Sequence, residues 1–268
     1  MKKQIVLLAL AAAVMLLFSC NKNKGETDRP PPRTYESSKP ATESYSFNKG
    51  YSLRVNAGFY KIEDNKDTGD ETAVAVWASN LALGENVMVG RPRKLTFIDN
   101  AKKKNVWDFI EIQLDDKNKT RGYALENQIA GGGYLAVVFD EKALLYSAAN
   151  ATKPTNTVVT KKTVVVYYPE SESSGFVEVK GWDCDPTKKN RLIPDNRYMR
   201  LSSISKDEPD IQTSILLQTA LTMTTDAQSV ARETLLKTAL QDYPGSVFSD
   251  EIRTLLNNPN SANNEGIF

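Results

Sequence analysis

The middle of the chain, residues 51–205, alternates short apolar runs with polar turns. β-branched and aromatic side chains dominate the runs, and Gly, Asn, Asp and Lys fill the stretches between them, which is typical of β-strands joined by turns. No segment of useful length with helical period interrupts the series. We therefore expect an all-β region, with strands at residues 53–62, 73–78, 94–98, 106–114, 122–125, 135–139, 143–146, 163–168, 176–180 and 198–201.

The spacing of apolar residues becomes helical after residue 205. Residues 210–222, 226–240 and 250–256 carry Leu, Ile and Val at intervals of three and four, which predicts helices. Asp226 is a suitable N-cap for the second of them, and Pro244 and Gly245 end it. The pattern predicts a mainly β protein with a helical segment at 207–256 and a disordered tail at 257–268.

The amino terminus has a different pattern. Lys2 and Lys3 precede an apolar run over residues 5–18, which is too short to span a bilayer and is typical of a signal peptide. The run ends in Leu-Phe-Ser-Cys20, which resembles the bacterial lipobox. That resemblance implies removal of residues 1–19 and acylation of Cys20, so that several acyl chains attach the protein to a membrane. The alternative is an uncleaved anchor with an incidental cysteine.

Residues 20–50 are rich in Asn, Lys, Glu, Ser, Thr and Pro and contain a run of three prolines from Pro30. A segment of this composition buries too little apolar surface to offset its ordering entropy. We expect a disordered tether between the lipid anchor and the folded part.

The all-β region contains a degenerate repeat. The sequence Phe-Ile-Glu-Ile from Phe109 corresponds to Phe-Val-Glu-Val from Phe176, and each is followed by a strand with a tyrosine, Tyr123 or Tyr198. Gly131-Gly132-Gly133 lies between the copies. The repeat predicts two β units, at 51–130 and 131–206.

The repeated unit resembles the bacterial type of Src-homology-3 (SH3) domain, a small β-barrel of cell-envelope proteins. Val-Trp-Asp-Phe-Ile-Glu-Ile from residue 106, Asp115-Asp116 and Gly-Tyr-Ala from residue 122 match its signature. The second copy departs from the signature, because Arg197 replaces the glycine and the loop before it is longer. The resemblance implies two tandem SH3-like β-barrels, and it suggests a fold more firmly than a function.

Strand alternation places candidate binding residues on the outer face. If the aliphatic residues of 106–114 face the core, Trp107 and Phe109 face outward, and outward aromatics can form a groove for a peptide or glycan. The alternative is that the two barrels, or a barrel and the helical segment, bury this face. The candidate ligand-binding residues are Trp107, Phe109, Tyr123, Tyr60 and Trp77 in the first unit and Phe176, Trp182 and Tyr198 in the second.

The composition excludes several classes of enzyme and gives little support to others. The chain has 34 basic and 33 acidic residues and no histidine, which excludes Ser-His-Asp and Cys-His hydrolases and gives no electrostatic reason to expect nucleic acid as a partner. Cys184 lies between two aspartates, which raise the pKa of a thiol and disfavour a nucleophile. The acidic stretch 63–71 carries Lys66 and Thr68 where a calcium loop requires Asp or Asn. We expect no cofactor, no metal and no enzymatic activity.

Two functions remain open. The first is a lipid-anchored envelope binding module on the periplasmic face of a membrane, whose SH3-like domains recognise peptidoglycan peptide or an extended protein segment. The second is a structural or assembly lipoprotein whose barrels and helical tail dock a protein partner.

Overall fold

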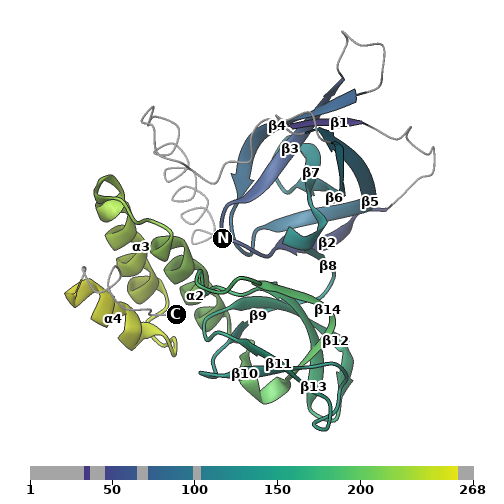
Figure 1. Cartoon of the computed structure of the whole chain (residues 1–268). Coiled ribbons are helices and arrows are strands. Elements are labelled where there is room, and N and C mark those ends of the chain that lie inside the picture. Colours follow the sequence, from purple (N-terminus) through teal and green to yellow (C-terminus); the bar gives the residue numbers. More distant parts are fainter. Residues whose placement is uncertain (1–32, 37–45, 65–71, 99–103, 259–268) are drawn as a thin grey trace.

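The structure is a computed structural model that describes residues 33–36, 46–64, 72–98 and 104–258, which form two β-sheets followed by helices (Figure 1). The mainly β class with C-terminal helices is confirmed. The first sheet contains β1 (Arg33–Glu36), β2 (Asn48–Ser52), β3 (Ala57–Asp64), β4 (Thr72–Leu81), β5 (Asn86–Ile98), β6 (Lys104–Leu114), β7 (Arg121–Leu125) and β8 (Ile129–Gly131). The second contains β9 (Tyr134–Val138), β10 (Ala143–Tyr146), β11 (Pro154–Val159), β12 (Val164–Ser173), β13 (Phe176–Trp182), β14 (Leu192–Arg200) and β15 (Ile204–Ser205).

The two sheets repeat one set of strand pairings. In the first sheet β5, β6 and β7 form an antiparallel meander, the 3₁₀ turn η1 (Glu126–Gln128) follows, and β8 returns to β2. In the second, β12, β13 and β14 form the meander, η2 (Leu201–Ser203) follows, and β15 returns to β9. In the first sheet β3 pairs with both β4 and β7, and in the second sheet β10 pairs in the same way with β11 and β14. Likewise β2 pairs with β5 in the first sheet, and β9 pairs with β12 in the second. The repeat expected from the sequence is therefore confirmed in the pairing.

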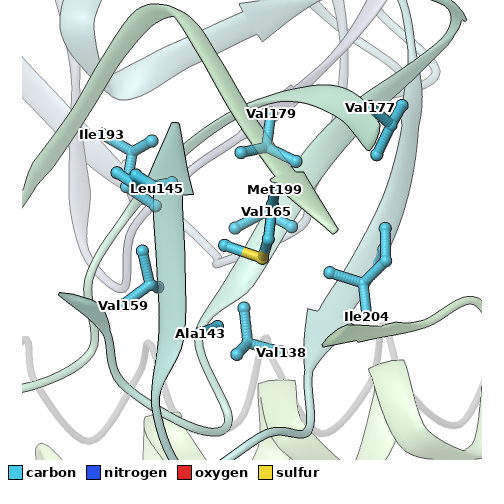
Figure 2. Packing of buried hydrophobic residues seen from close by; sticks show 11 residues of the cluster. Val138, Ala143, Leu145, Val159, Val165, Val177, Val179, Ile193, Met199 and Ile204 are labelled. Carbon is cyan, nitrogen blue, oxygen red and sulfur yellow. The ribbon is translucent and has the colours of Figure 1, made fainter. Parts of the chain in front are cut away.

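Each sheet packs around its own apolar core. In the second sheet the core side chains come from alternate residues of the meander, such as Val177 and Val179 on β13, and meet Val165, Leu145 and Met199 (Figure 2). In the first sheet the corresponding core is formed by Ala57, Phe59, Leu81, Val87, Val89, Ile112, Ala124 and Ile129. Burying each large aliphatic or aromatic side chain contributes roughly 1.5–3 kcal/mol.

Strands begin earlier than the composition suggested. β1 and the start of β2 lie within residues 20–50, the segment expected to be a disordered tether. β1 pairs with both β4 and β5, and β2 pairs with β5 and β8. These partners supply the backbone hydrogen bonds that such a polar segment lacks in isolation, so its composition alone gave the wrong structure for these residues. The remainder of the expected tether, apart from residues 46–47, lies outside the described residues.

Other strand boundaries also differ from expectation. The first expected strand, 53–62, starts with a turn in which Asn56 has a φ of 58°, and the strand begins only at Ala57. β5 begins at Asn86, eight residues before the expected start at 94. β11 was not expected because its Thr and Asn side chains are largely exposed and give no apolar alternation.

The two β units contact each other through a small apolar cluster. Tyr51, Leu53 and Ala130 of the first unit pack against Val166 and partly buried neighbours of the second. The connection between the units turns at Gly132 and Gly133, whose φ values of 75° and 64° favour glycine. A Cβ on Gly133 would also lie 2.6 Å from the carbonyl oxygen of Tyr167, so this turn needs glycine both for its backbone conformation and for space.

The helices α2 (Glu208–Leu221), α3 (Ser229–Asp242) and α4 (Ser249–Asn257) pack around their own cluster, which includes Leu217, Leu236 and Ile252; the 3₁₀ turn η3 (Asp226–Gln228) precedes α3. They also dock on the second sheet, where Ile211 and Phe248 meet Val137 of β9. The helical segment is therefore joined to the second β unit by apolar contacts.

Candidate functional site

Strand register brings three of the aromatic candidates together on the first sheet. The Cα partner of Tyr123 is Glu111 on one side and Tyr60 on the other, and the partner of Tyr60 on β4 is Trp77. Directly paired residues of antiparallel strands project to the same face. Tyr60, Tyr123 and Glu111 therefore form a row across β3, β7 and β6, on the side opposite the core residue Ile112.

Phe109 shares the face of Glu111, as alternation predicts, but its side chain is only 1% exposed. The ring of Tyr60 meets it edge to face, with centroids 5.9 Å apart and an interplanar angle of 88°. Tyr60 reaches this position over Gly58, where a Cβ would lie 2.6 Å from the tyrosine ring. Phe109 is therefore a packing residue beneath the outer face and offers no open surface of its own.

The two tryptophan candidates of the first unit differ in their relation to this row. Trp107 pairs with Leu95 of β5 and is partly buried. Trp77 is placed on β4 beside Tyr60 by its backbone, and its side chain lies outside the described part of the chain.

The second sheet carries the same row at the same register. Glu178 pairs with Tyr198, and Tyr198 pairs with Tyr146. The rings of Tyr146 and Phe176 meet edge to face with centroids 4.8 Å apart, so Tyr146 corresponds to Tyr60 and Phe176 to Phe109. Both units thus place one Glu, two Tyr and one Phe at equivalent positions.

In the second unit, Arg200 covers the aromatic rings of the row. Its guanidinium lies 5.3 Å from the centroid of the Phe176 ring and 5.8 Å from that of Tyr146, and its Nε donates to the Tyr146 hydroxyl over 3.2 Å. The equivalent residue in the first unit is Leu125, because Phe109 pairs with Leu125 as Phe176 pairs with Arg200. Phe176 is 4% exposed and, like Phe109, serves packing.

Trp182 does not join the other second-unit candidates. It packs against the cluster of Tyr51, Leu53 and Ala130 between the two units, with the guanidinium of Arg54 5.2 Å from its ring centroid. Its indole N–H is buried and has no hydrogen-bond partner among the described residues. The structure places this tryptophan in an internal contact.

An arginine lies beside Tyr123 in the open row of the first unit. The Arg93 guanidinium lies 5.9 Å from the centroid of the Tyr123 ring. Burial raises the pKa of Tyr123 above its usual value, Arg93 opposes that rise and Glu111 adds to it. The phenol therefore stays protonated at neutral pH and can donate a hydrogen bond.

An open hollow of about 310 Å³ adjoins this row. It is lined by Lys61, Glu111, Arg121, Gly122 and Tyr123. Of these, only Tyr123 was a candidate from the sequence. Glu111 could have been found from the repeated Phe-x-Glu-x sequence, whereas Lys61 and Arg121 approach it only through the pairing of β3, β6 and β7.

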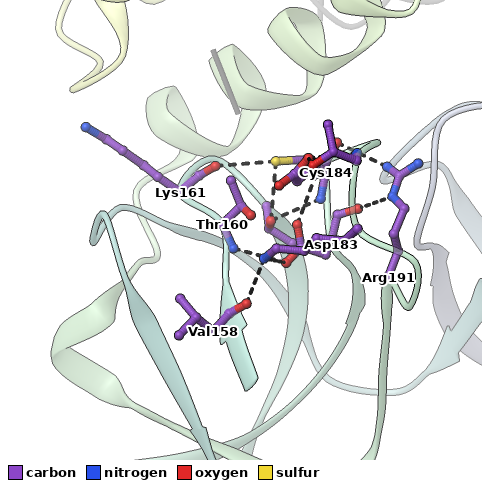
Figure 3. A network of polar contacts seen from close by, with 10 residues as sticks. Val158, Thr160, Lys161, Asp183, Cys184 and Arg191 are labelled. Atoms are coloured by element: carbon purple, nitrogen blue, oxygen red, sulfur yellow. Dashed lines mark hydrogen bonds and ion pairs between the residues drawn. The ribbon is translucent and has the colours of Figure 1, made fainter. Parts of the chain in front are cut away.

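Cys184 lies in the connection between β13 and β14, in a separate polar network that links this connection to the turn between β11 and β12 (Figure 3). Its backbone N–H donates to Thr163 Oγ1 over 3.2 Å, while Asp183 accepts from the Thr160 N–H and from Lys188 Nζ. Burial raises the pKa of the thiol to about 11, and Asp183 adds to the rise. The network therefore stabilises the turn and keeps the sulfur in its unreactive form.

The described residues offer neither a metal site nor a membrane-spanning helix. They contain no group of three or more metal-ligating side chains, and none of their helices is long and apolar enough to cross a membrane. Cys20 and most of the acidic stretch 63–71 lie outside the described part of the chain.

Comparison of the chain with protein-family models, with curated proteins and with solved structures finds no match.

Proposed function

We propose that the chain is a non-enzymatic, lipid-anchored protein of the bacterial cell envelope whose two β units are SH3-like barrels. The lipobox-like sequence before Cys20 supports the anchor. In each unit the meander is followed by a one-turn 3₁₀ helix and then an aliphatic residue, Ile129 or Ile204, as the family signature requires.

In this proposal the first unit recognises peptide of the cell wall or an extended protein segment. The main support for peptide recognition is the row of Tyr60, Tyr123 and Glu111, which borders an open hollow in the first unit. Its equivalent in the second unit is covered by Arg200. Half-buried tyrosines beside side chains of opposite charge suit an extended ligand that presents both apolar and polar groups.

Assembly with a protein partner is the second candidate. It is favoured by Trp182, which lies in the contact between the units, and by the burial of Phe109 and Phe176. In that case the aromatic residues maintain the shape of a scaffold, and the helical segment provides the docking surface.

Co-sedimentation with insoluble cell-wall sacculi tests the first candidate. The chain from residue 20, with Cys20→Ser, would be compared with the same chain carrying Tyr123→Ala or its matched control Tyr198→Ala. We expect the parent and Tyr198→Ala to sediment with the sacculi and folded Tyr123→Ala to stay in solution. Absence of parent sedimentation at any moderate salt concentration would contradict wall binding and favour the assembly role.

A further inference from the structure

The hollow on the first unit is lined by charged groups that do not pair with each other. Lys61, Arg121 and Glu111 border the same space of about 310 Å³. Within the described residues, neither the Glu111 carboxylate nor the Lys61 ammonium makes a hydrogen bond or an ion pair, and the Tyr123 hydroxyl makes no hydrogen bond. Opposite charges held around one space without pairing leave room for a ligand that carries both signs.

Arg121 is held in a fixed orientation. Its guanidinium lies 5.0 Å from the centroid of the Phe47 ring, and its Nε donates to Gln113 Oε1 over 3.2 Å. Phe47 can lie this close to the sheet because Gly90 has no side chain, since a Cβ there would lie 2.9 Å from the phenylalanine ring. The two terminal amino groups of the guanidinium have no partner among the described residues, and this orientation suits them to bind a carboxylate.

The second unit has counterparts of Glu111 and Tyr123. It has no basic residue at the positions equivalent to Lys61 and Arg121. Ser147 follows Tyr146 where Lys61 follows Tyr60, and Asn196 precedes Tyr198 by two residues where Arg121 precedes Tyr123. Glu178, the counterpart of Glu111, accepts a hydrogen bond from the Asn196 N–H over 3.0 Å. The unpaired charges are therefore a property of the first unit and not of the repeated fold.

We propose that this hollow binds a zwitterionic amino-acid group, meaning a carbon that bears both a free ammonium and a free carboxylate. Arg121 and Lys61 hold the carboxylate, Tyr123 donates a hydrogen bond to it, and Glu111 accepts from the ammonium. The volume lies at the lower end of the range for ligand pockets and fits a group of amino-acid size. Glu111 disfavours a purely anionic ligand, because its charge would then lack a partner.

This inference rests on the proposed function and specifies which part of a wall peptide is recognised. Stem peptides that contain a diamino dicarboxylic acid present such a group at the free end of its side chain. The same group distinguishes them from an extended protein segment, in which the backbone ammonium and carboxylate occur only at the chain ends.

Calorimetry with a synthetic tripeptide that ends in meso-diaminopimelate tests the inference on the chain from residue 20 carrying Cys20→Ser. We expect binding that weakens at least about tenfold when the free side-chain amine of the peptide is acetylated, because a charge-assisted hydrogen bond to Glu111 is lost. In Glu111→Gln the free and acetylated peptides should bind equally weakly. Arg121→Gln should weaken both, and the matched control Glu178→Gln should bind within about twofold of the parent.

Two results would overturn the inference. One is equal binding of the free and acetylated peptides by the parent protein, and the other is equal weakening by Glu111→Gln and Glu178→Gln in variants with parent-like circular dichroism. Sedimentation with sacculi without tripeptide binding would overturn this inference alone and leave wall binding supported. Absence of both would overturn the proposed function as well.

Discussion

Phe176 is covered on the outer face of β13 by groups from two neighbouring strands. Tyr146 meets its ring edge to face, and the Arg200 guanidinium lies over both rings. A side chain that faces away from the main core can thus be as buried as one within it, since Phe176 is 4% exposed. Packing at single residues, rather than strand alternation alone, decides which aromatics can touch a ligand.

Phe176→Ala should therefore behave as a core substitution. We expect a loss of about 3–5 kcal/mol in the free energy of unfolding, because the ring leaves a cavity between Tyr146 and Arg200. Urea unfolding followed by circular dichroism would measure it. Tyr134→Ala, which removes a ring that is 57% exposed, is the control and should cost under about 1 kcal/mol; similar losses in both variants would contradict this account.

Cys184 should make stability depend on alkaline pH. Its pKa is raised from an ordinary 9.0 to about 11 in the folded protein, so between these values the unfolded chain loses the thiol proton while the folded chain keeps it. The contribution is therefore fully present below pH 9 and declines as the pH rises to 11, by roughly 1.4 kcal/mol per pH unit.

Comparison with Cys184→Ala isolates this effect, since the other alkaline titrations are common to both proteins. With Cys20→Ser in both chains, the difference in unfolding free energy should shrink by about 2–3 kcal/mol between pH 9 and pH 11. A difference that stays constant over this interval would show that the thiol is not protected by folding.

At the scale of the strand, Gly122 fixes the approach of β7 to β3. A Cβ at this position would lie 2.5 Å from both the Phe59 ring and the carbonyl oxygen of Tyr60, and the carbonyl belongs to the backbone and has little freedom to move. The equivalent position in the second unit is Arg197, next to Tyr198. The two units therefore share strand pairing but differ in how closely these strands approach.

Gly122→Ala should destabilise the protein by about 1–3 kcal/mol through overpacking. Arg197→Ala, the matched substitution in the second unit, should stay within about 0.5 kcal/mol of the parent. Thermal unfolding of both variants measures the contrast, and a Gly122→Ala protein as stable as the parent would show that β3 and β7 can separate without cost.

Strand alternation and helical period predicted much of this architecture. On β6 they assigned Ile110, Ile112 and Leu114 to the core, as observed, and they located the three helices to within a few residues. They failed for β1 and β11, which are strands because neighbouring strands pair with them and not because their own residues alternate.

The candidate site was less predictable, because its members come from separate strands. Tyr60 and Tyr123 lie 63 positions apart in the chain and become neighbours only through the pairing of β3 with β7. Burial of Phe109 depends on where a tyrosine from another strand places its ring. Lys61 and Arg121 carry no local pattern, so sequence alone could not associate them with Glu111.

At the scale of the whole molecule, several polar contacts between the helices and the second sheet converge on Lys162, and we call these contacts the joint. The carbonyl of this residue accepts hydrogen bonds from Ser214 Oγ and from Gln218 Nε2, the latter over 2.7 Å, and its ammonium pairs with Glu251. Lys162 has a φ of 75°, so the turn between β11 and β12 holds an unfavourable backbone conformation where α2 and α4 contact it.

Gln218→Ala should cost about 1–3 kcal/mol, because it removes a buried donor to the Lys162 carbonyl. Gln212→Ala on the same helix, which loses an exposed bond to Glu208, should change stability by less than about 0.5 kcal/mol. Urea midpoints of the two variants check this, and equal midpoints would mean that the hydrogen bond from Gln218 to the Lys162 carbonyl adds no stability.

The same joint has a consequence for the order of events during synthesis. The partners of the Lys162 turn follow it by 52, 56 and 89 residues. A chain made from its amino terminus therefore completes the strands of the second unit well before it can complete the turn between β11 and β12. Until Ser214 has left the ribosome the second unit lacks all three contacts, and it lacks the ion pair until Glu251 has followed. The first unit already has every strand it needs at that stage.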